Sequence, residues 1–132
     1  MIGGEESFGC ERCWPASPDD AWKARASLSH QATVIDEAHF IASLLGCPVC
    51  SQRFVSVFAE SIDWVGGEDP QWWVQLPLTS SEATQLTRKD ARVTESDLAG
   101  LAAGKRSLIT GFPKGGVETC AWGTGLSIGW HD

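Results

Sequence analysis

The stretch "TVIDEAHFIASLLGCPVC", residues 33–50, carries two kinds of structural signal. Its apolar residues recur at helical spacing, at Val34, Ile35, Ala38, Ile41, Ala42 and Leu45. This spacing predicts a helix from about Ile35 to Leu45, which Gly46 would end as a left-handed cap. Asp36 and Glu37 would then lie in the first turn, where negative charge meets the positive end of the helix dipole. The stretch closes on Cys47-Pro48-Val49-Cys50, a C-x2-C pair.

A second C-x2-C pair, Cys10-Glu11-Arg12-Cys13, lies upstream. Two such turns can aim four thiolates at one ion, with backbone N–H groups pointing at the sulfurs, in a closed tetrahedral site. The pairs resemble the knuckles of zinc-ribbon and rubredoxin-like proteins, which usually place Gly after the second Cys, where this chain has Trp14 and Ser51. The resemblance implies a structural zinc site, with iron as the alternative because rubredoxins bind it through the same thiolates. Its ligands would be Cys10, Cys13, Cys47 and Cys50.

Other thiol chemistries fit the sequence less well. In a thioredoxin-like motif the pair begins a helix, whereas Cys47–Cys50 is expected to follow a helix and precede a strand. A zinc deaminase needs His-x-Glu, which neither His30 nor His39 supplies. Thiols that bind no metal remain an open alternative. Cys120 lies in an apparently alternating segment, 117–122, and is expected to be a buried core thiol.

Signs of an enzyme are weak. Asp36-Glu37-Ala38-His39 resembles the magnesium-binding motif of DEAH-box helicases, but the required phosphate loop is absent, because 100–106 has the wrong spacing and order. A chain of 132 residues also corresponds to about one domain, too few for a helicase motor. The candidate bases are His30, His39 and His131, and no catalytic triad, metal-hydrolase motif or cofactor motif accompanies them. We therefore expect no enzymatic activity.

The composition is acidic. Ten Lys and Arg stand against 17 Asp and Glu, for a formal net charge of -7 and a pI near 4.8. Nucleic-acid binding draws on neutralised phosphates, so this charge argues against a nucleic-acid partner. No apolar run approaches a membrane span, and the N-terminus lacks the features of a secretory signal. We expect no membrane association and a cytoplasmic location.

The order of elements predicts a small single α+β domain with short antiparallel strands, several helices and the zinc knuckles. Residues 1–9 would form a flexible N-terminus and 10–132 the domain. Helix starts are predicted at Ser17-Pro18, Ser80-Ser81-Glu82 and Thr94-Glu95. Strands are predicted at 54–59, 72–76, 107–110, 117–122 and 126–128.

The segment "DWVGGEDPQWW", residues 63–73, gathers acids, glycines and tryptophans. Neighbouring strand residues point to opposite faces, so Trp72 and Trp73 cannot share one core without a bulge. Exposed Trp beside acids is typical of an interface, where the aromatic anchors the complex and charge steers the approach. The spacing of the three acids matches no known calcium-binding loop. The simplest alternative to an interface is that the three tryptophans are core residues. The candidate partner-binding residues are Asp63, Trp64, Glu68, Asp69, Trp72 and Trp73.

Two functional hypotheses follow. The first is a non-enzymatic, zinc-stabilised acidic module that binds a basic protein, most concretely a bacterial immunity or antitoxin-like inhibitor or an adaptor. Zinc with four thiolates would take the formal charge to about -9 and sharpen the preference for a cationic partner. The second is a redox or metal-dependent enzyme that uses the thiolate site directly.

Overall fold

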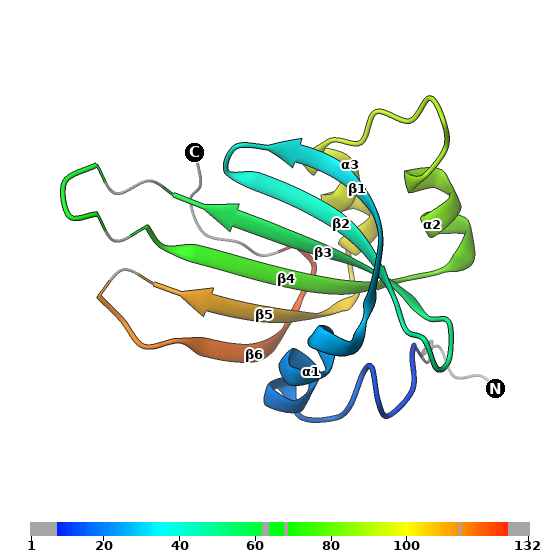
Figure 1. Cartoon of the computed structure of the whole chain (residues 1–132), viewed down its shortest axis with the longest axis horizontal. Helices are drawn as coiled ribbons and strands as arrows, with labels where there is room; N and C mark the ends of the chain where they lie inside the picture. The colour runs from blue at the N-terminus through cyan, green and yellow to red at the C-terminus, as the bar shows by residue number, and fades with distance from the viewer. Residues whose placement is uncertain (1–7, 62–63, 68, 114, 127–132) are drawn as a thin grey trace.

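A six-stranded antiparallel sheet dominates the computed structural model, which describes residues 8–61, 64–67, 69–113 and 115–126. The strands lie side by side in chain order (Figure 1). They are β1 (Ser29–Glu37), β2 (Phe40–Gly46), β3 (Arg53–Glu60), β4 (Gln71–Leu78), β5 (Arg106–Phe112) and β6 (Thr119–Thr124). The helices of the described chain are α1 (Pro18–Ala24), continued by a 3-10 turn (Arg25–Ser27), α2 (Ser80–Leu86) and α3 (Glu95–Ala102). The fold is thus mixed α and β, as predicted.

All three predicted helix starts are confirmed to within a residue. The Ser17 side chain accepts a hydrogen bond from the backbone of α1, which has Pro at its first position. Thr79 and Thr94 begin α2 and α3 with complete capping boxes, closed by Glu82 and Asp97. These short helices therefore begin where the sequence supplies partners for their free N–H groups.

The predicted helix at 35–45 is wrong, because the chain forms an antiparallel hairpin there. Glu37 of β1 pairs with Phe40 of β2, which leaves a two-residue turn at 38–39. The apolar residues also recur with a period of two, and the buried ones on β2 include Phe40, Ala42 and Leu44. Branched and aromatic side chains favour that period. Asp36 consequently lies exposed near the end of β1 and not in a helix.

The remaining strand predictions agree with the structure as far as it describes them. β3, β4, β5 and β6 overlap the predicted segments, each with shifted ends. Most of the predicted strand 126–128 lies outside the described residues. Trp72 and Trp73 are consecutive residues of β4 and are both half-buried. No described helix has the length and apolarity that crossing a membrane requires.

Two hydrophobic clusters cover the two faces of the sheet. One, here called the aliphatic cluster, lies under α2 and α3. Its buried members are Ile35, Phe40, Ala42, Leu44, Val55, Val57, Ala59, Val74, Leu76, Leu78, Ala83, Leu86, Leu98 and Ala102. The other, the thiol cluster, lies under α1 and the first C-x2-C turn. Its buried members are Cys13, Trp14, Ala21, Leu45, Cys47, Phe54 and Leu108. Alternation along β3, with Phe54 in one cluster and Val55 in the other, assigns the clusters to opposite faces.

Candidate metal centre

The second C-x2-C turn connects β2 to β3 at one end of the sheet. Its backbone closes through two hydrogen bonds, from Ser51 N to Cys47 O at 3.0 Å and from Cys47 N to Gln52 O at 2.9 Å. The N–H of Val49 points at the Cys47 sulfur, 3.4 Å away. The prediction that Cys47–Cys50 follows a helix is wrong, because the pair lies within a β-hairpin.

The first C-x2-C turn precedes α1 and closes in the same way. Trp14 N donates to Cys10 O at 2.8 Å, the counterpart of the Ser51 bond in the other turn. The N–H of Cys10 points at the Cys13 sulfur, 3.2 Å away. Each turn thus directs a backbone N–H at one of its sulfurs.

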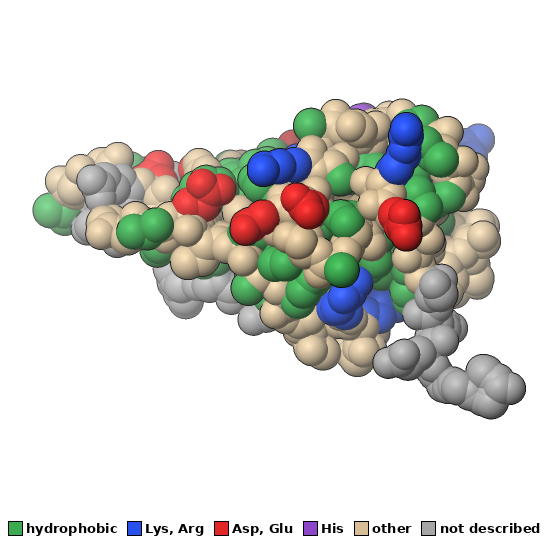
Figure 2. All heavy atoms as spheres, turned by 90° about the horizontal axis from the view of Figure 1, so that it is seen from below, with side chains coloured by type: hydrophobic (Ala, Val, Ile, Leu, Met, Phe, Trp, Pro, Cys, Tyr) green, Lys and Arg blue, Asp and Glu red, His purple; other side chains and the backbone are tan. Residues whose placement is uncertain are grey.

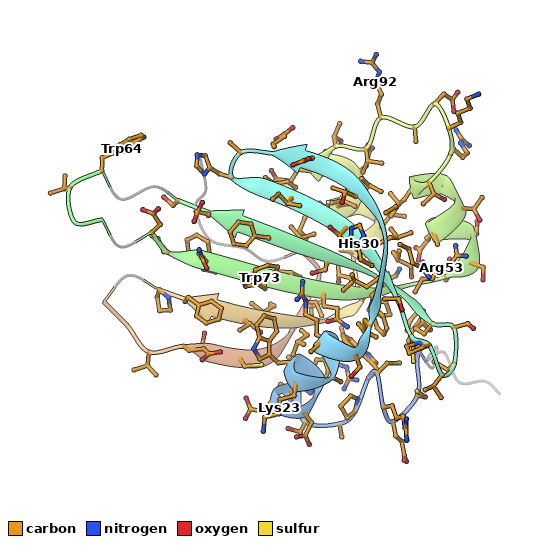
Figure 3. All side chains as sticks on the ribbon, in the orientation of Figure 1. Lys23, His30, Arg53, Trp64, Trp73 and Arg92 are labelled. Carbon is orange, nitrogen blue, oxygen red and sulfur yellow. The ribbon has the colours of Figure 1, made fainter. Side chains whose placement is uncertain are left out.

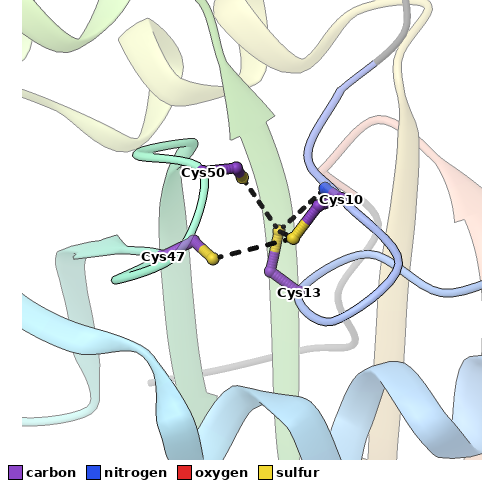
Figure 4. A group of neighbouring side chains, drawn as sticks. All are labelled: Cys10, Cys13, Cys47 and Cys50. Carbon is purple, nitrogen blue, oxygen red and sulfur yellow. Dashed lines mark hydrogen bonds between the residues drawn. The ribbon is translucent and has the colours of Figure 1, made fainter.

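The two turns bring four sulfur atoms together from loops far apart in the chain (Figure 4). The Sγ of Cys10 lies 3.7 Å from that of Cys13 and 3.9 Å from that of Cys47, and Cys13 Sγ lies 3.7 Å from Cys50 Sγ. All four sulfurs lie within 4.8 Å of one another. A tetrahedron with metal–sulfur bonds of about 2.3 Å has edges of about 3.8 Å. The spacing therefore suits a tetrahedral ion and is far too long for disulfides, which measure about 2.0 Å.

Glycine-like backbone conformations mark both turns. Ser51, directly after the second pair, has a φ of 66°, the left-handed conformation for which knuckles usually use Gly. Trp14 has no such conformation and is instead buried in the thiol cluster. At the first turn the positive φ, 70°, belongs to Gly9, where a Cβ would lie 2.8 Å from the Cys13 sulfur. The glycine requirement has thus moved from after the pair to before it.

The four thiols differ in exposure, and the pKa values of Cys10 and Cys13 are shifted in opposite directions. Cys13 and Cys47 are buried, Cys10 is half-buried and Cys50 is exposed. A backbone hydrogen bond from Cys13 lowers the pKa of Cys10 to about 7, whereas burial raises the pKa of Cys13. A bound cation would oppose the effect of burial by stabilising the thiolates.

Cys120 lies outside this group, on β6. It is half-buried against the thiol cluster, and its thiol donates to the backbone oxygen of Pro18 at 3.3 Å. Thr110 donates to its sulfur at 3.6 Å, and burial raises its pKa. Cys120 is thus a packing residue that attaches α1 to the sheet, less buried than the sequence predicted.

Gln52 connects the two turns and is a residue that the sequence analysis missed. Its Oε1 accepts from Gly9 N at 3.0 Å, and its Nε2 donates to the backbone oxygens of Arg53 and Leu78, each at 2.7 Å. One side chain therefore ties the first turn to β3 and β4. Its place directly after the second turn is the only sequence signal that could have indicated this role.

The candidate bases and acids are not assembled into a catalytic site among the described residues. His39 Nδ1 lies 3.2 Å from Glu60, and His30 Nε2 lies 3.0 Å from Thr33 Oγ1. Asp36 and Glu37 are exposed on β1. His131 lies outside the described residues.

The candidate partner-binding residues lie on the β3–β4 hairpin. Trp64 is at its tip with 87% of its surface exposed, and neighbouring Val65, which the sequence analysis did not select, is 98% exposed (Figure 3). Trp73 packs against Phe58, with ring centroids 4.7 Å apart. Trp72 is half-buried and pairs with Gly111 of β5. Asp69 is exposed, and Asp63 and Glu68 lie outside the described residues.

Comparisons with known proteins give no relative: no family model, curated protein or solved structure matches the chain.

Proposed function

We propose that this chain is a non-enzymatic acidic module that binds a basic protein through the tip of its β3–β4 hairpin. The observation that carries the proposal is the exposed pair Trp64 and Val65. The hairpin extends beyond its neighbours at one end of the sheet (Figure 1), and hydrophobic side chains are exposed at that narrow end (Figure 2). Exposing Trp is costly in a monomer, whereas a Trp seated in a partner's pocket is a frequent binding hot spot.

The net charge of -7 supports a cationic partner. Acidic and basic side chains are interspersed on the face seen in Figure 2, so attraction would come from the net charge more than from one patch on that face. A stable acidic domain that masks a basic surface fits the role of an immunity or antitoxin-like inhibitor, or of an adaptor.

The proposed metal is zinc, held by Cys10, Cys13, Cys47 and Cys50, with iron as the alternative. Zinc would supply a cross-link between the first turn and the β2–β3 turn. Four thiolates complete the coordination shell of a tetrahedral ion, which supports a structural role. The second candidate, a redox or metal-dependent enzyme, is favoured only by the exposure of Cys50. Metal analysis separates them: colourless protein with one zinc supports the module, and red protein with stoichiometric iron supports redox chemistry.

The first test is a pull-down that identifies proteins bound by the wild-type chain and not by Trp64→Ala. Binding kinetics are then measured with the recovered partner. Trp64→Ala should speed dissociation, with a loss on the order of 2 kcal/mol or more. Asp69→Asn should mainly slow association and reduce its salt dependence. Val49→Ala is the control, because this side chain is 59% exposed but lies at the opposite end of β3. An acidic partner, or equal affinity of Trp64→Ala and wild type, would contradict the proposal.

A further inference from the structure

A hollow of about 460 Å³ opens on the face of the sheet that carries the thiol cluster. Its apolar walls include Ile41, Phe58 and Trp73, and its polar groups include Arg25, Ser56 and Gln71. These residues come from the 3-10 turn after α1 and from β2, β3 and β4. The volume lies in the range of about 300–1,000 Å³ that is usual for small-molecule sites.

The Arg25 guanidinium is fixed at the wall of this hollow. Its Nη2 and Nε donate to Ser56 Oγ at 2.7 and 3.3 Å. Its central carbon lies 4.5 Å from the ring centroid of Trp73 and 5.5 Å from that of Trp22. Contacts with two aromatic faces and one hydroxyl hold the cation in place before any ligand arrives.

No carboxylate pairs with Arg25 among the described residues. The ion pairs found there are His39–Glu60 and Lys105–Glu82. Glu60 lies on β3 beyond Phe58, on the same face, but its oxygens are occupied by His39 at 3.2 Å and Gln71 at 3.1 Å. Burial lowers the pKa of Arg25, as expected of a partly desolvated cation without an anionic partner.

We propose that the hollow binds a small organic carboxylate with an aromatic or aliphatic body. The ligand's carboxylate pairs with Arg25, whose planar fork matches two carboxylate oxygens. The body of the ligand lies against Trp73 and Phe58. Such a ligand supplies the missing counter-charge and covers the apolar wall at the same time. This site is separate from the hairpin tip and goes beyond the proposed protein-binding function.

The test is an NMR titration of the full chain with 3-phenylpropionate, its neutral amide and acetate, followed at the Trp73 indole N–H. The carboxylate should bind at least about tenfold more tightly than the amide, because hydrogen bonds to charged groups are the stronger ones. Acetate should also bind more weakly, because it lacks a body to cover the apolar wall.

Variants assign the effect to one residue. Arg25→Gln should bind the carboxylate no better than wild type binds the amide. Lys23→Gln removes the same charge from the exposed side of α1 and should bind like wild type (Figure 3). Equal binding of carboxylate and amide, equal binding of acetate and 3-phenylpropionate, or no carboxylate binding at concentrations on the order of 10 mM overturns the proposal. The ligand comparisons use wild-type protein, so they decide the matter even if Arg25→Gln does not fold.

Discussion

The two faces of the sheet are closed in different ways. On the aliphatic face, two capped helices lay Leu and Ala side chains on Val and Leu of the strands. On the thiol face, one seven-residue helix and a loop carry tryptophans and cysteines, with Trp14 4.8 Å from Trp122 and 5.1 Å from Phe54. All three helices of the described chain have only seven or eight residues and are unstable alone, so each depends on what holds it to the sheet. Packing of apolar side chains closes the aliphatic face, whereas we expect the thiol face to depend also on a metal ion held by its four cysteines.

Loss of the cross-link should have the largest effect. Cys47→Ser is expected to lose about one metal ion per chain and the soluble folded state, because metal binding and folding share one free energy, on the order of 10 kcal/mol. Elemental analysis and circular dichroism measure the two losses. Cys120→Ser is the matched control and should keep its metal, since this thiol lies outside the group of four. Wild-type protein that is stably folded without metal would remove the distinction between the faces.

Substitutions in the aliphatic cluster should have a smaller effect on stability, and this effect should not depend on metal. Leu98 on α3 is fully buried, so Leu98→Ala should lower the free energy of unfolding by about 2–5 kcal/mol. Leu101 is half-buried on the same helix, so Leu101→Ala should lower the free energy of unfolding by less. Denaturant titration gives both values. If Leu98→Ala released the metal while still folded, the two faces would be coupled and not separately closed.

A pH-dependent contribution is expected from the start of α2. Burial alone would raise the pKa of Glu82, but hydrogen bonds from Lys105 and the Thr79 backbone bring it below its ordinary value. A lowered folded pKa means stability that is present above the unfolded pKa of about 4.3 and is lost as the pH falls through the folded value. Glu82→Gln should therefore lower the free energy of unfolding by about 1–2 kcal/mol at neutral pH, and by progressively less below about pH 4. Unfolding measured against pH tests this. Exposed Glu118→Gln should show no comparable change.

The smallest effect concerns the thiol face again. Ser51→Gly should relieve the left-handed backbone and raise the free energy of unfolding by up to about 1 kcal/mol, since the greater freedom of Gly in the unfolded chain offsets part of the gain. Gly9→Ala should act in the opposite direction, because its Cβ would meet the Cys13 sulfur. Thermal unfolding of metal-loaded protein compares the two. A destabilised Ser51→Gly would show that the serine side chain matters more than its backbone conformation.

The parts of the fold that local chemistry determines could be predicted from the sequence. Helix starts depend on capping side chains within four residues, and the cysteine group follows from two short spacings. The β1–β2 hairpin could not be predicted in this way, because the run 34–45 satisfies both the helical and the strand periodicity, and its tight turn at Ala38-His39 lacks Gly, Asn or Asp. The hollow beside Arg25 could not be predicted, because its walls come from five elements, the 3-10 turn and β1 to β4, that only the folded sheet brings together. The identity of the metal stays a prediction.

The order of the strands also bears on how the chain folds. Every strand pairs with its neighbour in the sequence, so the sheet can grow by successive local contacts, a topology that favours fast folding. The N-terminal layer is the exception: Pro18 contacts Cys120, and Ala16 accepts a hydrogen bond from Trp122. The segment before α1 must therefore wait for β6, more than 100 residues later in the chain, before it is covered. Until this layer closes, the thiols of Cys10 and Cys13 remain open to solvent and to oxidation.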